Sequence, residues 1–264
     1  MGNGEHPSRS AATAASVDLV RGGQPRRAYR RPGHQPKKIL PLAAAAFCWR
    51  ERPKRSIMRA MNTLYDYLDS GNGFKIRLLL AQLKQPYRWI EKDILASETR
   101  TPEFLAKNPN GRIPALELDD GTVISESNAI LWYLAEGSPF IPDNRLQRAQ
   151  VLQWMFFEQY SHEPYVATSR FIVKHFPADS PRQAELPDRM ARGRAALGVM
   201  DTHLAQQPFF AGQAYTLADI ALYAYTHVAH EAGFDLAPYK NVRGWIERVA
   251  SQPGYVSIYQ RPGN

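Results

Sequence analysis

The order of strand and helix patterns in residues 64–135 constrains the fold more than any other feature of the chain. The patterns follow one another as strand, helix, strand, strand, strand and helix, at residues 64–68, 74–83, 87–90, 112–118, 122–124 and 129–135. A β-α-β unit followed by a β-hairpin and a helix gives a mixed four-stranded sheet with helices packed on it. We therefore expect an α/β domain here.

Two local signals support this order. Asp119-Asp120-Gly121 separates two β-like runs, which is a strong signal for a tight hairpin. Ser127 stands just before the last helical pattern and is predicted to cap it. A further short helix is predicted at 102–107.

The second half of the chain is predicted to be helical. After a Gly- and Pro-containing linker at 137–144, helical patterns cover residues 146–176, 188–205 and 241–251. Pro164 should kink or split the first of these. Thr216 and Asp219 have capping-box spacing and predict one more helix start, a structural role rather than a catalytic one.

The net charge is carried by the first 60 residues. The 264 residues have a formal net charge of +8, but residues 1–60 hold 13 of the 33 Lys and Arg and only 3 of the 25 Asp and Glu. The remaining 20 basic and 22 acidic residues leave the body with a net charge of −2. Because the excess of positive charge lies in residues 1–60 and not in residues 61–264, nucleic-acid binding is not expected.

Residues 1–60 are predicted to be a disordered basic leader. They have no sustained periodicity, and their apolar run at 39–49 has basic residues on both sides, which disfavours a secretory signal. An organelle transit peptide fits the Arg-rich, acid-poor composition better. We favour a third interpretation, in which the natural protein begins at Met61 or Met58.

The body of the protein contains no cysteine. The one cysteine, Cys48, lies in the leader, so no internal disulfide, multi-thiolate metal site or protein thiol chemistry is expected. His227, His230 and Glu231 match no zinc motif, and no metal is predicted. Phosphate-loop and dinucleotide fingerprints are absent, and no apolar run is long enough to span a membrane.

Four short motifs in one order carry a family resemblance. They are Ser-Gly-Asn-Gly-Phe-Lys at 70–75, Asn-Pro-Asn-Gly-Arg-Ile-Pro at 108–114, Glu-Ser-Asn-Ala-Ile at 126–130 and Tyr-Leu at 133–134. With the capping element at 216–219, the chain resembles the glutathione transferases over residues 62–258. The resemblance implies a thioredoxin-like glutathione-binding domain at 62–137 and an all-α domain at 145–258.

The same resemblance implies the catalytic residues. The turn before the first helix carries the thiol-activating hydroxyl in the family, which points to Ser70. The run from Ser70 to Lys75 is most similar to the nu class, which implicates Asn72 as a second donor. Without the resemblance, Asn72 and Gly73 could equally serve a helix cap and a tight turn. Tyr65 and Tyr67 are the tyrosine alternatives, although strand tyrosines usually pack.

Glutathione is the co-substrate that the resemblance implies, and five residues are expected to hold it. The main chain of Ile113 beside Pro114, the family's cis-proline, would bind the peptide in strand fashion. Glu126 and Ser127 would receive the γ-glutamyl ammonium and carboxylate. Arg112 is the candidate for the glycyl carboxylate, with a solvated loop charge as the alternative.

The second substrate is expected between the two domains. Of the aromatic and polar residues in the first long helices, Tyr160 and His162 are the predicted pocket residues, although most such residues pack in cores. The substrate would be a small electrophile, or a disulfide if the activity is reduction. A non-catalytic binding module is the remaining alternative. The family implies a cytoplasmic homodimer, and no membrane or nucleic-acid partner is expected.

Overall fold

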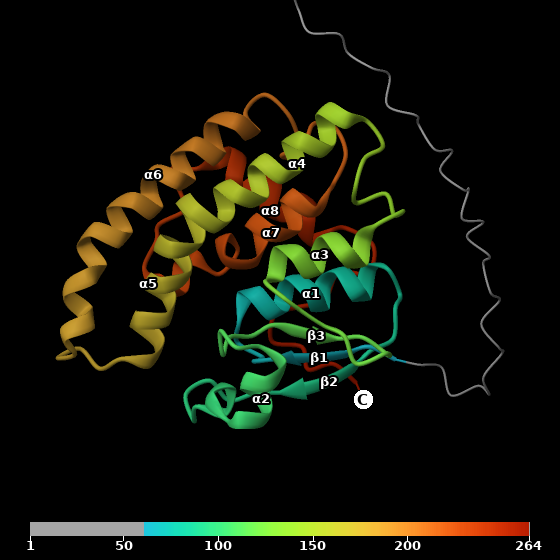
Figure 1. The fold of residues 1–264 in the computed structure, drawn as a ribbon. Helices are drawn as coiled ribbons and strands as arrows, with labels where there is room; N and C mark the ends of the chain where they lie inside the picture. The colour runs from blue at the N-terminus through green and yellow to red at the C-terminus, as the bar shows by residue number, and fades with distance from the viewer. Residues whose placement is uncertain (1–60, 264) are drawn as a thin grey trace, which may run out of the picture. The chain divides into compact units, whose positions relative to one another are not determined.

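The computed structural model describes residues 61–263, so the predicted leader lies outside the described residues. Its first half is an α/β layer in which α1 and α3 cover one face of the sheet and α2 lies on the other, and the second half is a helical bundle beside α1 and α3 (Figure 1). The predicted α/β and all-α fold classes are confirmed.

The sheet has four strands in the order β2-β1-β3-β4. These are β1 at Thr63–Asp66, β2 at Arg88–Glu91, β3 at Ala115–Glu117 and β4 at Val123–Ser125. β1 pairs parallel to β2, as the β-α-β order requires, and antiparallel to β3. The β3–β4 hairpin forms at the predicted turn, where Gly121 has a φ of 87°.

Three α-helices and one short 3₁₀ turn complete this half: α1, η1 and α2 lie between strands, and α3 follows the last strand. They are α1 at Gly71–Gln82, η1 at Glu98–Arg100, α2 at Pro102–Lys107 and α3 at Ser127–Ala135. α1 begins three residues before its apolar pattern, because Ser70 caps it through a bond from the Gly73 N–H. The predicted capping by Ser127 is wrong: Glu126 is the N-cap residue of α3, and the Ser127 hydroxyl bonds to Asn72 instead.

The second half consists of helical segments. They are α4 at Arg145–Phe157, η2 at Glu158–His162, α5 at Glu163–His175, η3 at Pro181–Glu185, α6 at Leu186–Leu204, α7 at Leu217–Thr226, η4 at Ala229–Ala232 and α8 at Lys240–Ala250. The split predicted near Pro164 is present, since η2 is a single π-helical turn and Pro164 stands in the first turn of α5.

Helix α7 is the centre of the bundle, and all ten of its residues are buried. The predicted capping box is confirmed: the Asp219 carboxylate accepts bonds from the main-chain N–H and the hydroxyl of Thr216. It also accepts a bond from the Trp245 indole at 3.0 Å, which ties α7 to α8. α7 packs against α1, so one apolar core continues through both halves.

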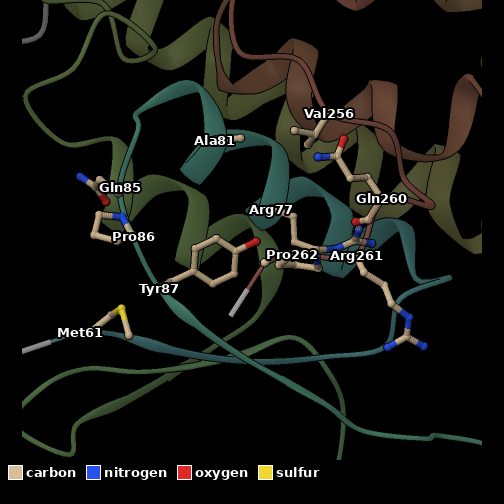
Figure 2. A pocket seen from close by; sticks show the side chains of 11 residues that line it. Met61, Arg77, Ala81, Gln85, Pro86, Tyr87, Val256, Gln260, Arg261 and Pro262 are labelled. Carbon is tan, nitrogen blue, oxygen red and sulfur yellow. Dashed lines mark hydrogen bonds between the residues drawn. The ribbon is translucent and has the colours of Figure 1, made fainter.

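The C-terminal tail returns to the α/β layer and is held there by Arg77. This buried guanidinium pairs with Asp66 at 2.9 Å and donates to the carbonyl of Ile258 at 2.8 Å. A cavity of about 320 Å³ lies beside it, between the tail, the end of α1 and Tyr87 (Figure 2). The Arg77 donors are directed at protein oxygens, so this cavity is supported by a structural ion pair.

Candidate functional site

The turn between β1 and α1 brings two polar side chains to the start of a helix. Ser70 and Asn72 both line a cleft of about 550 Å³, together with groups from α5 and α7. The turn can form because Gly71 and Gly73 have no side chain: a Cβ atom at Gly71 would lie 2.6 Å from the Tyr225 ring, and one at Gly73 would overlap the Asp66 carboxylate. The local sequence is therefore fixed by close packing on both sides.

Asn72 is held by four hydrogen bonds. Its amide oxygen accepts from the Lys75 ammonium at 2.8 Å and from the Ser127 hydroxyl at 3.1 Å. Its amide nitrogen donates to the Glu163 carboxylate at 2.7 Å, and its main-chain N–H donates to the Tyr225 hydroxyl at 3.3 Å. The side chain is thus fixed by α1, α3 and α5, and the main chain by α7.

A second, polar cavity of about 70 Å³ adjoins the cleft. All five residues predicted to hold the peptide line this cavity: Arg112, Ile113, Pro114, Glu126 and Ser127. Four residues line both the cavity and the cleft: Asn72, Arg112, Ile113 and Glu163. The Ile113–Pro114 peptide bond is cis, as the resemblance implied. Glu126 has a φ of 69°, a conformation that non-glycine residues rarely adopt and that is common at binding sites.

The structure does not bring Tyr160 and His162 to the cleft. The Tyr160 side chain is 83% exposed on the outer surface. His162 is fully buried, and its Nε2 lies 3.0 Å from the Thr226 hydroxyl. Burial, together with the Lys75 charge, lowers the pKa of His162 to about 3, so it is a neutral core residue. Phe171 and Thr168 of α5 line the cleft in their place.

Four site residues were not identified from the sequence. Tyr225 lines the cleft from α7, and burial raises the pKa of its hydroxyl, which therefore keeps its proton at neutral pH. Glu163 and Lys75 bond to the Asn72 side chain, and Glu158 accepts a bond from Lys75. Only Lys75 had a sequence signal: it stands three residues after Asn72 and so shares its helix face.

Two classes of feature are absent from residues 61–263. This part of the chain contains no group of three or more His, Cys, Asp or Glu side chains that could hold a metal ion. Within the same residues, no helix combines the length and apolar character needed to cross a bilayer.

Two family models match the chain. The model "Glutathione S-transferase, N-terminal domain" matches residues 60–136, and "Glutathione S-transferase, C-terminal domain" matches residues 153–253. Together they cover more than half of the chain and coincide with the α/β layer and the helical bundle. The chain belongs to the glutathione S-transferase family.

Solved structures and a curated relative are similar to this family member over most of its length. A glutathione S-transferase from Pseudomonas fluorescens [Pf-5] is 50% identical with a TM-score of 0.74, covering 76% of this chain and 100% of its own. Disulfide-bond oxidoreductase YfcG of Escherichia coli (strain K12) is 32% identical over 194 residues, which are 71% of this chain and 89% of that protein. "Ure2p in Complex with Glutathione" is 26% identical with a TM-score of 0.67, covering 74% and 96%.

Proposed function

We propose that this glutathione S-transferase family member binds glutathione, stabilises its thiolate with Ser70 and Asn72, and conjugates it to a small electrophile. The observation that carries this proposal is the convergence of the two side chains and the start of α1 on a cleft that adjoins a polar cavity. A helix N-terminus with added neutral donors favours an anion at that place. The polar cavity is the proposed position of the peptide.

Hydrogen-bond donors at the start of α1 can lower the pKa of the glutathione thiol by the amount that the reaction requires. A thiol with a pKa of about 8.5 is roughly 3% thiolate at pH 7, and lowering the pKa by about two units makes it roughly three-quarters thiolate. The shift corresponds to about 2.7 kcal/mol, a magnitude that two or three hydrogen bonds to an anion can supply. The Tyr225 hydroxyl, which keeps its proton, is a further donor at the same turn.

Five residues are proposed to hold the peptide in the polar cavity. The Ile113 main chain, ahead of Pro114, would pair with the cysteinyl unit of glutathione in strand fashion. Because the Ser127 hydroxyl already donates to Asn72, Ser127 would bind the γ-glutamyl carboxylate through its main-chain N–H, together with the other free N–H groups at the start of α3, and Glu126 would bind the ammonium. Arg112 is exposed and would bind the glycyl carboxylate. We propose that residues 62–137 form the glutathione-binding domain and that the helical domain at 145–258 contributes the binding surface for the second substrate.

The proposed reaction needs no group beyond these. The thiol proton leaves to water, and a sulfur lone pair then forms a bond to the electrophilic carbon. In a substitution the leaving group on that carbon departs with its electron pair. In an addition the electrons of the carbon's double bond move to the neighbouring atom. Phe171 and Ala167 give the cleft an apolar wall for such a substrate. We place the reaction in the cytoplasm, where glutathione is abundant and thiols stay reduced.

Glutathione-dependent disulfide reduction is the second candidate. The 32% identity to a disulfide-bond oxidoreductase favours it, and the reaction does not require a cysteine, of which residues 61–264 have none. The bound thiolate would attack one sulfur of the disulfide and release the other as a thiolate. A second glutathione thiolate would then release the substrate and form glutathione disulfide. The protein would supply no sulfur in either step.

Three measurements separate the candidates. Calorimetry with reduced and oxidised glutathione tests binding, a dinitrohalobenzene assay tests conjugation, and a small-disulfide assay coupled to glutathione reductase tests reduction. Turnover of the halide alone supports conjugation, and turnover of the disulfide alone supports the second candidate. Binding without turnover of either identifies a non-catalytic module, and no binding of either form of glutathione overturns the proposal.

A homodimer is proposed through the surface of α3 and α4. A groove of about 800 Å³ is lined by Trp132, Tyr133, Leu152, Met155 and Phe156, among others, and Phe156 is 70% exposed. Glu136, which follows α3 and lines this groove, is paired with Arg148 of the same chain at 3.7 Å, so the apolar side chains are the proposed contact with a second copy. Glu126 and Gln159 line both this groove and the polar cavity, which places the proposed interface beside the glutathione site.

The oligomeric state tests this surface directly. We expect a dimer by sedimentation, and a monomer for Phe156→Glu, because a charge would be buried in the interface. Val199→Glu is the matched control, since Val199 is 50% exposed on α6 and outside the groove. A monomeric wild type, or a dimeric Phe156→Glu, would contradict the assignment.

A further inference from the structure

Lys75 is a buried cation that joins three elements of the proposed glutathione site. Its side chain is fully buried, and its ammonium lies 2.8 Å from the Asn72 amide oxygen, 3.2 Å from the Ser127 hydroxyl and 2.9 Å from Glu158 Oε1. These three acceptors satisfy the three donors of an ammonium. They come from α1, α3 and η2, two segments of the α/β layer and one of the helical bundle.

The ammonium determines which way the Asn72 amide points. An amide has an oxygen that only accepts and a nitrogen that only donates, whereas Lys75 can only donate. The oxygen must therefore face Lys75 and Ser127, and the nitrogen must face Glu163 and the cleft. If the amide were turned over, its NH₂ group would meet the ammonium and its oxygen would meet the Glu163 carboxylate, two repulsive contacts.

From this geometry we infer that Lys75 is a positioning residue, which fixes the Asn72 amide so that its second N–H, the one not bonded to Glu163, faces the glutathione sulfur. The inference rests on the proposed function, because the orientation matters only if a thiolate forms in the cleft. Lys75 touches neither cleft nor polar cavity in the structure and acts through Asn72. The amide is held in its donor orientation before substrate binds, which is the preorganisation that anion-stabilising sites need.

Glu158 makes a buried charge possible at this place. Its Oε1 pairs with Lys75, and its Oε2 accepts from the Asn128 side chain at 3.2 Å. Glu158 is fully buried and begins the π-helical turn between α4 and α5. An ion pair in a protein interior contributes little net stability, whereas one partner left alone is strongly destabilising. The pair is therefore better explained by the orientation it imposes than by stability.

The charged and titratable groups near Lys75 are few. Glu158 pairs with Lys75 directly, and Glu163 lies on the other side of the Asn72 amide. The positive charge of Lys75 also lowers the pKa of His162. Burial raises the pKa of the Glu158 carboxyl to about 7, although the Lys75 charge lowers it. Measurements of thiol ionisation should therefore extend above pH 7, where Glu158 is ionised.

The test replaces both charges together. In Lys75→Met/Glu158→Met neither partner is left as a lone buried charge, so the protein is expected to fold. The control is Lys107→Met/Glu117→Gln, which removes the ion pair between α2 and β3 at 2.8 Å, because neither residue lines the cleft or the polar cavity. The readout is the pKa of bound glutathione, from thiolate absorbance in a pH titration. We expect the thiol pKa to rise by about one unit in the first variant, which is a tenfold fall in the acid dissociation constant, and to keep the wild-type value in the control.

A third variant distinguishes orientation from a general structural role. In an Asn72→Ala background no amide remains to be oriented, so adding Lys75→Met/Glu158→Met should raise the thiol pKa no further. A wild-type thiol pKa in the double variant, or an undiminished effect in the Asn72→Ala background, would overturn the inference. A wild type that binds no glutathione would overturn the proposed function instead.

One measurement on the unaltered protein covers the case in which the double variant does not fold. NMR contacts from the Asn72 NH₂ protons report the amide orientation directly. Contacts to the Glu163 side chain support the inference. Contacts to the Ser127 β-protons instead would show the opposite orientation and overturn it.

Discussion

The hydroxyl of Tyr225 lies 3.3 Å from the main-chain nitrogen of Asn72, although 153 residues separate them in the chain. Tyr225 belongs to the central helix of the bundle, and Asn72 to the turn proposed to activate the thiol. The bundle thus contributes to the geometry of that turn and does more than cover it.

Removing this hydroxyl should weaken both the turn and the proposed chemistry. In Tyr225→Phe the Asn72 N–H loses its acceptor and the cleft loses a donor, so we expect a loss of about 1 kcal/mol in stability and a severalfold fall in kcat. Urea unfolding and steady-state kinetics measure the two effects. Tyr255→Phe is the control, because its hydroxyl bonds only to that of Tyr223, away from the cleft. Equal kinetics in the two variants would exclude a role for Tyr225 in the reaction.

The side chain of Ser70 has two roles that can be separated. In Ser70→Ala the thiol loses a donor, so we expect the pKa of bound glutathione to rise by about one unit and kcat/KM to fall at least tenfold. α1 also loses its cap, at a cost of about 1 kcal/mol. Thr101→Ala removes the equivalent cap of α2 and should lower stability alone. If Asn72→Ala and Ser70→Ala both leave the thiol pKa unchanged, their proposed catalytic roles are wrong.

Gly71 is expected to tolerate no side chain. A Cβ atom there would lie 2.6 Å from the Tyr225 ring, which is buried and cannot move aside. Gly71→Ala should therefore lower the free energy of unfolding by about 1–3 kcal/mol, the usual cost of overpacking. Gly198→Ala, on α6 with open space around the position, should be neutral or stabilising. Thermal unfolding of the two variants compares them directly.

Arg112 is expected to act on binding only. Its side chain is exposed and lines both cavities, so Arg112→Ala should raise the KM for glutathione about tenfold with kcat nearly unchanged. The effect should shrink at high salt, because an exposed charge is screened. Arg88→Ala, at an exposed position on β2, is the control. A fall in kcat with constant KM would contradict a binding role.

Buried His162 should make the protein sensitive to acid. Its pKa falls from an unfolded value of 6.5 to about 3 because burial disfavours the charged ring. The unfolded chain therefore binds a proton that the folded chain does not, and stability is complete above pH 6.5 and lost as the pH falls toward 3. His162→Gln should reduce the slope of unfolding free energy between pH 6 and 4 by up to about 1.4 kcal/mol per pH unit. His230→Gln, at an exposed position, should leave that slope unchanged.

The sequence predicted the fold well because the fold depends on local periodicity. The strand and helix patterns, the hairpin at Gly121 and the capping box at Thr216 and Asp219 are all local signals, and each is present in the structure. Boundaries were less accurate where a cap or a tertiary bond decided them. α1 begins at Gly71 because Ser70 caps it, and Ser127 is no cap because its hydroxyl bonds to Asn72.

The sequence by itself determined the succession of an α/β half and a helical half, five of the residues that line the polar cavity, and the absence of any cysteine from residues 61–264. Only the tertiary structure decided that Tyr225 and Lys75 meet at Asn72, that Glu158 pairs with Lys75, and that His162 lies in the core. The physical reason is the separation along the chain over which each interaction acts. Periodicity and capping act over a few residues and are visible in a chain, whereas a hydrogen bond between residues 153 positions apart depends on how whole helices pack.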